Sequence, residues 1–122
     1  MAEKDVLGRA GEERAAQYLH NGGLAVVDRN WRCRDGEIDI VALSARELIV
    51  VEVKTRRGED FGHPFEAVDA QKRRRMWRVA MAWIAAHPEH AQGRTLRLDA
   101  IALTGGDPTV ARLEHLSDLD LS

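Results

Sequence analysis

The stretch GEIDIVALSARELIVVEVKTRR, residues 36–57, decides the fold of this chain. Its first half alternates, because successive side chains of a β-strand point to opposite faces, and one face carries Glu37 and Asp39. Its second half, residues 47–55, is rich in β-branched residues and places Glu52 and Lys54 together on one face. The opposite faces carry the apolar side chains Ile38, Ile40, Ala42, Val51 and Val53. We therefore predict two antiparallel strands, joined by a turn at Ala45-Arg46.

The expected register brings two acids together. A turn at this position pairs Leu43 with Leu48, which places Asp39 opposite Glu52. Directly opposed side chains on one face have Cβ atoms about 5 Å apart, so the two carboxylates repel each other unless a positive charge lies between them. Mg²⁺ or Mn²⁺ is typically held by one or two carboxylates together with phosphate oxygens of a substrate. The hairpin therefore predicts a divalent-metal site at Asp39 and Glu52.

Two simpler interpretations remain open at this point. The hairpin could be plainly amphipathic, with its charges on a wet face, or the acids could form a structural salt bridge with Lys54. The run VVEVK, residues 50–54, is the most hydrophobic of the chain and is typical of a central strand. Carboxylates in such a strand usually need a partner, and the same register offers one by placing Glu37 opposite Lys54.

Composition sets the broad class of the protein. At 122 residues we expect one domain, residues 1–122, and 44% hydrophobic with 31% charged residues fits a globular protein in solution. The N-terminal residues include no apolar signal segment, and no run approaches a membrane span. Cys33 is the single cysteine, which is compatible with a cytoplasmic protein. A net charge of −2 indicates that any affinity for nucleic acid comes from a local basic patch.

The pattern along the chain predicts an α/β fold, a mixed β-sheet flanked by helices, in the order α-β-β-β-α-β-β. Asp5 is expected to cap a first helix over 6–21, and a second helix begins after Asp69 and ends near Pro88. Short strands are expected over Leu24–Asp28, 96–103 and 110–116, and a polar loop over 56–64. The second helix has an apolar stripe expected to face the core: Met76, Val79, Ala80, Trp83 and Ile84.

The first helix carries a third acid of interest. Glu12 shares one stripe with Gly8, Ala15 and Leu19, so it interrupts a small and apolar face. An acid on the buried side of a helix is a candidate metal ligand or base. A glutamate at the edge of the stripe, reaching solvent or an arginine, is an equally good interpretation of Glu12 alone.

Several motifs in a fixed order resemble one known family. These are GxxGExxAxxYL at 8–19, RNW at 29–31, GEIDIVA at 36–42, VVEVKTR at 50–56 and FGHPFEAV at 61–68. The chain resembles the YraN family of endonuclease-like bacterial proteins over nearly its whole length. That family is similar to archaeal Holliday-junction resolvases and to the PD-(D/E)xK nuclease superfamily, so the resemblance implies a PD-(D/E)xK, restriction-endonuclease-like core.

The resemblance also implies a role for each acidic residue and for one lysine. Asp39 corresponds to the aspartate of the first motif, although Ile38 replaces the usual proline before it, and Glu52-Val53-Lys54 corresponds to the D/E-x-K motif. Glu12 corresponds to the helical glutamate of resolvase-like members. The implied catalytic residues are Glu12, Asp39, Glu52 and Lys54, and the implied metal ligands are Asp39, Glu52, the carbonyl of Val53, and Glu12.

Basic residues lie on either side of the acids in the sequence. The second helix opens with QKRRRMWR, and two arginines follow Lys54. Such clusters neutralise phosphates and set backbone register without reading base sequence, whereas a solvated helix face is the simpler interpretation. The predicted nucleic-acid contacts are Arg56, Arg57, Lys72, Arg74, Arg75 and Arg78.

The sequence thus predicts a Mg²⁺- or Mn²⁺-dependent DNA endonuclease, with a preference for branched or junction DNA implied by the resemblance. Cutting a symmetric junction would favour a two-fold homodimer. The first alternative is a nucleic-acid-binding module that keeps the fold and cuts nothing. The second is a small scaffold protein whose acids are clustered by accident.

Overall fold

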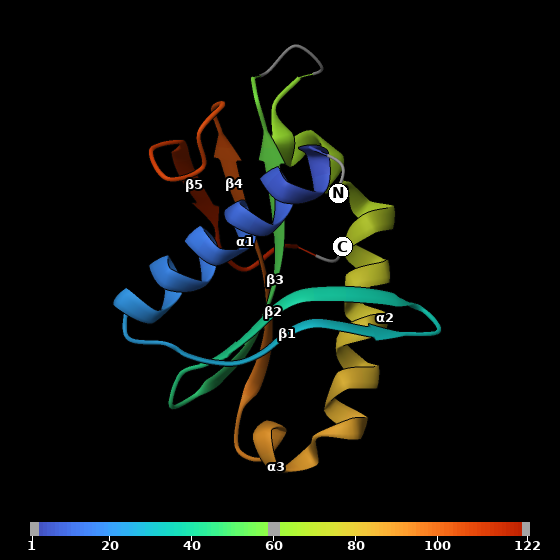
Figure 1. Ribbon diagram of the computed structural model, residues 1–122. Helices are drawn as coiled ribbons and strands as arrows, with labels where there is room; N and C mark the ends of the chain where they lie inside the picture. Colours follow the sequence, from blue (N-terminus) through green and yellow to red (C-terminus); the bar gives the residue numbers. More distant parts are fainter. Residues whose placement is uncertain (1–2, 59–61, 121–122) are drawn as a thin grey trace.

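The computed structural model describes residues 3–58 and 62–120 and shows a five-stranded mixed sheet with helices packed on it (Figure 1). The strands lie side by side in sequence order, and β3 and β4 form the parallel pair. They are β1 (Ala25–Cys33), β2 (Gly36–Leu43), β3 (Glu47–Arg56), β4 (Thr95–Thr104) and β5 (Arg112–Leu116). The longer helices are α1 (Glu3–Asn21) and α2 (Ala70–Ala86), and the short ones are η1 (Pro64–Ala67) and α3 (Pro88–Ala91). The predicted α/β class and element order are confirmed.

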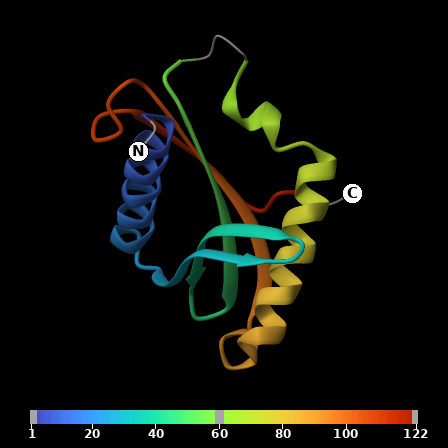
Figure 2. The same ribbon diagram turned by 45° about the vertical axis from the view of Figure 1, so that its right-hand side comes forward.

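The sheet is covered on both faces. Figure 2 shows α1 and α2 on opposite sides of it. Ala15 and Leu19 of α1 pack with Ile40 and Val51 on one face. On the other face, a larger cluster surrounds α2, whose predicted stripe is confirmed with Trp83 at its centre and Ile84 at its margin. Because β3 is covered from both sides, its residues Leu48, Ile49, Val50 and Val51 are almost fully excluded from water.

The predicted β2–β3 hairpin is confirmed. Leu43 pairs with Leu48, and the backbone N–H of Ser44 donates to the carbonyl of Glu47 at 2.9 Å, so the turn is centred on Ala45 and Arg46. The Ser44 hydroxyl also accepts from the backbone N–H of Glu47 at 3.0 Å. The ladder ends at the pair Ile40–Val51, however, one position before Asp39 would meet Glu52.

The strict alternation predicted for residues 37–43 is wrong around Asp39. Ile38 packs with Val41 in the cluster around α2, whereas Ile40 packs on the α1 side. The change of face coincides with Asn30 of β1, which lies between the pairs Arg29–Ile40 and Trp31–Ile38 and has a positive φ of 53°. The left-handed backbone of Asn30 interrupts the regular pleat of β1. The paired strand β2 changes the face to which its side chains point at the same place.

The first strand is longer than predicted. The expected strand over Leu24–Asp28 continues to Cys33 and forms an antiparallel hairpin with β2 through a turn at Arg34 and Asp35. Its second half is polar and basic because this strand lies at the edge of the sheet, where alternate side chains face water. A composition of this kind resembles a loop when read as sequence.

The helix boundaries largely match the prediction. Asp69 caps α2 by accepting from the N–H of Lys72 at 2.9 Å, and the helix ends before Pro88. Asp5 was wrongly predicted as the cap of the first helix, because α1 begins at Glu3 and Asp5 lies inside it. The predicted polar loop over 56–64 is one residue shorter at each end, because Arg56 belongs to β3 and Pro64 begins η1. Residues 59–61 of this loop lie outside the described parts. No helix in the described ranges is long and apolar enough to cross a membrane.

A buried polar centre fixes the far side of the sheet. Asp99 of β4 is 0% exposed, and its carboxylate accepts two hydrogen bonds from Arg97, both at 2.9 Å. His115 Nε2 of β5 lies 2.7 Å from the same carboxylate, and the backbone N–H of Asp118 donates to it at 3.0 Å. Burial raises the pKa of Asp99, but these hydrogen bonds outweigh burial and hold the pKa below its usual value.

Candidate functional site

Asp39 lies where β2 and β3 stop pairing. Its Oδ2 accepts a hydrogen bond from the backbone N–H of Val53 at 2.7 Å. This contact replaces the next rung of the ladder and holds the carboxylate against β3, beside Glu52. The predicted proximity of Asp39 and Glu52 therefore arises through a side-chain bond to the backbone rather than through a continued strand pair.

The pKa of Asp39 reports how crowded the acids are. Burial, and after it the negative charge of Glu52, raise this pKa from 3.8 to about 7, although the Val53 hydrogen bond opposes both. Glu12 and Glu37 raise it as well. We refer to Glu12, Glu37, Asp39 and Glu52 as the acid cluster. Its carboxylates repel one another as the sequence predicted, and a cation added to the cluster would relieve that repulsion.

Glu52 is the most enclosed member of the acid cluster, at 8% exposed. Its Oε1 forms ion pairs with Lys54 Nζ at 3.1 Å and with Lys72 Nζ at 3.3 Å. Lys72 comes from the first turn of α2, so the structure places a predicted phosphate contact inside the cluster itself. The structural salt bridge left open by the sequence is therefore present, and it involves a second lysine.

Glu12 reaches the acid cluster from α1. The helix can approach β3 closely because Gly11 has no side chain, and a Cβ at this position would collide with Thr55. The side-chain amide of Asn30, with its nitrogen turned toward Glu12, donates to Oε1 at 2.7 Å and to Oε2 at 3.2 Å. Burial raises the pKa of Glu12, Arg29 opposes this, and Glu37 and Glu52 raise the pKa further. The buried-side interpretation of Glu12 is supported.

Glu37 does not pair with Lys54 as predicted. It lies opposite Arg32 of β1 and forms an ion pair with it at 3.2 Å. The prediction was wrong because β2 remains paired with β1 at this point, while its pairing with β3 has already ended. Glu37 is exposed and contributes to the cluster through its charge.

The chemistry of the acid cluster suits a hard cation, although its side chains are held by other partners. Among the described residues, no three acidic, histidine or cysteine side chains form a ready-made metal site. Glu52 faces two ammonium groups and Glu12 faces an amide, so each would have to turn to become a ligand. Carboxylate oxygens are the donors that Mg²⁺ and Mn²⁺ prefer, and burial together with the neighbouring acids raises the pKa of Asp39, so a cation there would be favourable. The donor set therefore fits such an ion.

The predicted basic contacts lie on two elements next to the acid cluster. Arg56 and Arg57 follow Lys54 and are exposed at the end of β3. Three more arginines are exposed on α2 after Lys72: Arg74, Arg75 and Arg78. Exposed guanidinium groups beside a cluster of acids provide the positive charge that a phosphate backbone would need.

Two residues of the site were not selected from the sequence. Asn30 orients Glu12, and Gly11 allows α1 to bring that glutamate to β3. Both lie within the motifs GxxGExxAxxYL and RNW that carry the family resemblance, which was the available signal. Neither residue type has a side chain that suggests metal chemistry by itself.

The chain is similar to other bacterial proteins over nearly its whole length. A family model described as "Uncharacterised protein family UPF0102" matches residues 11–103. A UPF0102 protein of Paenarthrobacter aurescens (strain TC1) is 50% identical over 116 residues, which cover 95% of this chain and 94% of that protein. A UPF0102 protein of Arthrobacter sp. (strain FB24) is 49% identical, covering 95% of this chain and 97% of that protein. The matched region includes every member of the acid cluster. The chain therefore belongs to the UPF0102 family, which is the YraN family that its motifs predicted.

Proposed function

We propose that this protein is a metal-dependent DNA endonuclease with a PD-(D/E)xK-like core and that it hydrolyses phosphodiester bonds at the acid cluster. The observation that carries the proposal is the approach of the Asp39 carboxylate to β3, beside Glu52. Lys54 forms an ion pair with the carboxylate of Glu52. Two acids from adjacent strands and a lysine two residues after the second acid form the donor set that phosphodiester hydrolysis requires.

The residues of the acid cluster have distinct roles in this proposal. Asp39 and Glu52 would hold Mg²⁺ or Mn²⁺, together with the carbonyl of Val53 and with Glu12. Such an ion supplies a Lewis acid and a bound water of lowered pKa. Lys54 stabilises negative charge that develops on the phosphate. Asn30 keeps Glu12 aimed at the cluster.

The basic residues define where the nucleic acid would lie. Lys72, on α2, contacts Glu52, so in this proposal the start of the helix would lie beside the reacting phosphate. Arg74, Arg75 and Arg78 continue the positive charge along α2, and Arg56 and Arg57 extend it from β3. A two-fold dimer would present two such surfaces to the two strands of a branched junction. The proposal also includes a cytoplasmic location, where the protein has access to DNA.

A second candidate function has its own supporting observation. Lys54 and Lys72 both occupy the Glu52 carboxylate, which neutralises it without a metal ion. A nucleic-acid-binding module that cuts nothing would be stable in this arrangement. It would show salt-dependent affinity for DNA and no turnover with either metal.

A cleavage screen with matched variants separates the two candidates. Wild type is incubated with linear, flapped and four-way-junction DNA, and with RNA of the same sequences, in the presence of Mg²⁺ or Mn²⁺. Cleavage that disappears in Asp39→Asn supports the nuclease. Calorimetric titration with Mn²⁺ should show binding that Asp39→Asn abolishes. Binding of DNA without cleavage of any substrate by wild type would favour the module.

A further inference from the structure

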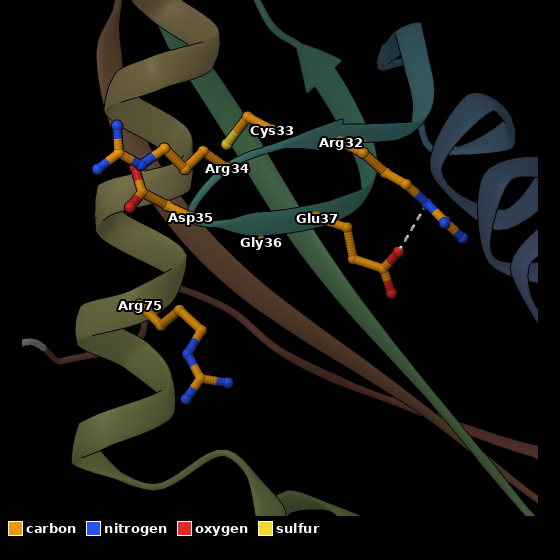
Figure 3. Close-up of a pocket in the computed structure, with 7 residues that line it drawn as sticks. All are labelled: Arg32, Cys33, Arg34, Asp35, Gly36, Glu37 and Arg75. Atoms are coloured by element: carbon orange, nitrogen blue, oxygen red, sulfur yellow. Dashed lines mark ion pairs between the residues drawn. The ribbon is translucent and has the colours of Figure 1, made fainter.

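A charged hollow lies between the tip of the β1–β2 hairpin and α2. Its volume is about 380 Å³, at the lower end of the range for small-ligand sites. Figure 3 shows Arg75 reaching from α2 beneath the hairpin, on the same side as Glu37. The lining includes no aromatic side chain, so the aromatic rings on which bases commonly stack are missing from the hollow.

The hollow is built by close packing at Gly36. This glycine has a φ of +142° and begins β2 immediately after the turn. A Cβ added to it would lie 3.3 Å from Val79 and 3.8 Å from the Cδ of Arg75, so the hairpin rests directly on α2. The hairpin tip and the helix therefore present their arginines to one shared space.

The charges around the hollow favour an anion. Arg32, Arg34 and Arg75 line it, opposed by Asp35 and Glu37. Arg32 already pairs with Glu37 at 3.2 Å. Among the residues that the structure describes, the side chains of Arg34 and Arg75 have no ion pair or hydrogen bond of their own. A guanidinium group binds phosphate through two parallel hydrogen bonds, and Arg75 beneath the hairpin is free to do so, while Arg34 adds positive charge at the hairpin tip (Figure 3).

The hollow adjoins the acid cluster on two sides. Glu37 belongs to both, because it lines the hollow and its charge raises the pKa of Asp39. Arg75 follows Lys72 by three residues on α2, which is about 4.5 Å along a helix axis. Lys72 contacts Glu52 within the cluster. A strand with one phosphate at the cluster would therefore bring a neighbouring phosphate to the hollow.

We propose that this hollow binds a backbone phosphate of the substrate strand, next to the phosphate held at the acid cluster. The proposal rests on the proposed function and adds a positioning site to it. Arg75 holds the flanking phosphate, with Arg34 adding positive charge at the hairpin tip, and so fixes how far the strand slides past the acids. A substrate that lacks this phosphate binds less tightly and is cut at less regular positions.

The chain contains its own reporter for occupancy of the hollow. Cys33 is the single cysteine and lines the hollow with a partly exposed thiol. The rate at which a thiol reagent modifies Cys33 is measured with and without a fluorescent duplex oligonucleotide, in EDTA, so that no cleavage takes place. Bound DNA should slow the modification several-fold. A duplex with neutral methylphosphonate linkages should protect Cys33 less at equal occupancy.

Matched variants test the arginines directly by fluorescence anisotropy at several salt concentrations. The double variant Arg34→Gln/Arg75→Gln should bind DNA more weakly and flatten the salt slope by about one unit for the lost phosphate. Arg46→Gln removes a charge at the opposite end of β2, in the β2–β3 turn, and should leave the slope unchanged.

The outcomes separate this proposal from the function on which it rests. DNA binding with an unprotected Cys33 and an unchanged slope in the double variant would overturn the hollow and leave the nuclease intact. An equal effect of Arg46→Gln would also overturn it, because the loss would then reflect total charge. Absence of any DNA or RNA binding by wild type would overturn both.

Discussion

Asp39 has a pKa near neutral pH and lies among other carboxylates. Its carboxyl is held by the Val53 N–H, but burial and the neighbouring Glu52 raise its pKa to about 7. A group of this kind is protonated in the folded protein at pH values where the unfolded chain is ionised. Folding stability therefore depends on pH through this residue.

The sign of that dependence gives the first prediction. Between about pH 4 and pH 7 the folded state binds more protons at Asp39 than the unfolded state, so the free energy of unfolding falls as the pH rises through this window. Asp39 is half-buried and solvent screens part of the effect, so we expect a loss of about 1–3 kcal/mol. Urea denaturation of the metal-free protein at pH 4.5 and pH 7.5 measures it.

Asp39→Asn is the matched variant for this measurement. It keeps the shape of the side chain and removes the titration, so its stability should change less over the same pH range. At pH 7.5 it should be at least as stable as wild type, because one of the repelling carboxylates is gone. A variant much less stable than wild type at pH 7.5 would contradict the prediction.

Substitution of Lys54 is expected to change the cleavage rate much more than the affinity for DNA. Lys54→Ala removes one ammonium group from Glu52 but leaves Lys72 in contact with the same oxygen, so the fold should persist. We expect cleavage to fall about 100-fold or more, because the lost interaction is strongest in the transition state. DNA affinity should fall only by the loss of one charge. Single-turnover cleavage and anisotropy measure the two quantities, and equal cleavage by variant and wild type would point to another mechanism.

Single residues were predictable where their chemistry is distinctive. Asp39, Glu52 and Lys54 were selected from alternation and register before any geometry was known. Asn30 was not, because its role depends on a left-handed backbone and an amide that reaches a helix distant in sequence. The pairing of Glu37 was predicted wrongly, because no local pattern shows where one ladder ends and another continues.

The second helix, α2, has one face buried in the core and another face that is exposed and basic. Met76 and Trp83 are buried against the sheet, while Arg74 and Arg78 lie one turn apart and are exposed. We expect Arg74→Gln/Arg78→Gln to weaken DNA binding similarly for unrelated sequences and to flatten the salt slope by about two units. The apolar face is untouched, so the melting temperature should stay close to that of wild type.

Anisotropy titrations with two duplexes of different sequence, at several salt concentrations, provide the measurement. Circular dichroism checks that α2 remains folded in the variant. An unchanged salt slope would show that this helix face points away from the nucleic acid.

Elements were predicted best where apolar periodicity is strong. The second helix, with its cap at Asp69 and its stop before Pro88, was placed within a residue or two. The first strand was cut short at Asp28, because its exposed basic half lacks the apolar alternation of a core strand. A hairpin at the edge of a sheet is stabilised by its partner strand more than by its own composition.

At the scale of the whole molecule, a polar anchor at Asp99 of β4 holds the last strand and the C-terminal segment in place. Asp99 connects β4 to β5 through His115 and to the C-terminal segment through the N–H of Asp118, while the N–H of Leu119 donates to Leu98 at 2.7 Å. Asp99→Ala leaves Arg97 half-buried without this partner. We expect it to lower the free energy of unfolding by about 3–5 kcal/mol, the usual effect of breaking a buried ion pair.

Denaturant unfolding of Asp99→Ala, with His115→Gln as a milder control, measures this loss. His115→Gln keeps both bonds between Arg97 and Asp99, so it should destabilise the protein less. Because the pKa of Asp99 is lowered, its contribution to stability is present at neutral pH and is lost as the pH falls below about 4. A neutral effect of Asp99→Ala would show that the anchor is dispensable.

The overall class was predictable because seven periodic elements in this order leave few arrangements. The sheet order and the two-sided packing followed from how these elements meet in space. The close contact between Gly11 and Thr55 also depends on how the elements meet in space, since a glycine in a helix does not indicate which strand it will touch.

The two lysines on Glu52 have a thermodynamic consequence. A divalent ion bound at the Glu52 carboxylate competes with the two ammonium groups that both contact its Oε1. Lys54 and Lys72 are then released to bind phosphate, so each ligand removes an obstacle to the other. Linkage requires the effect to be reciprocal: metal should strengthen DNA binding by the same factor by which DNA strengthens metal binding. The free protein would thus hold both ligands weakly, and the pair would bind cooperatively.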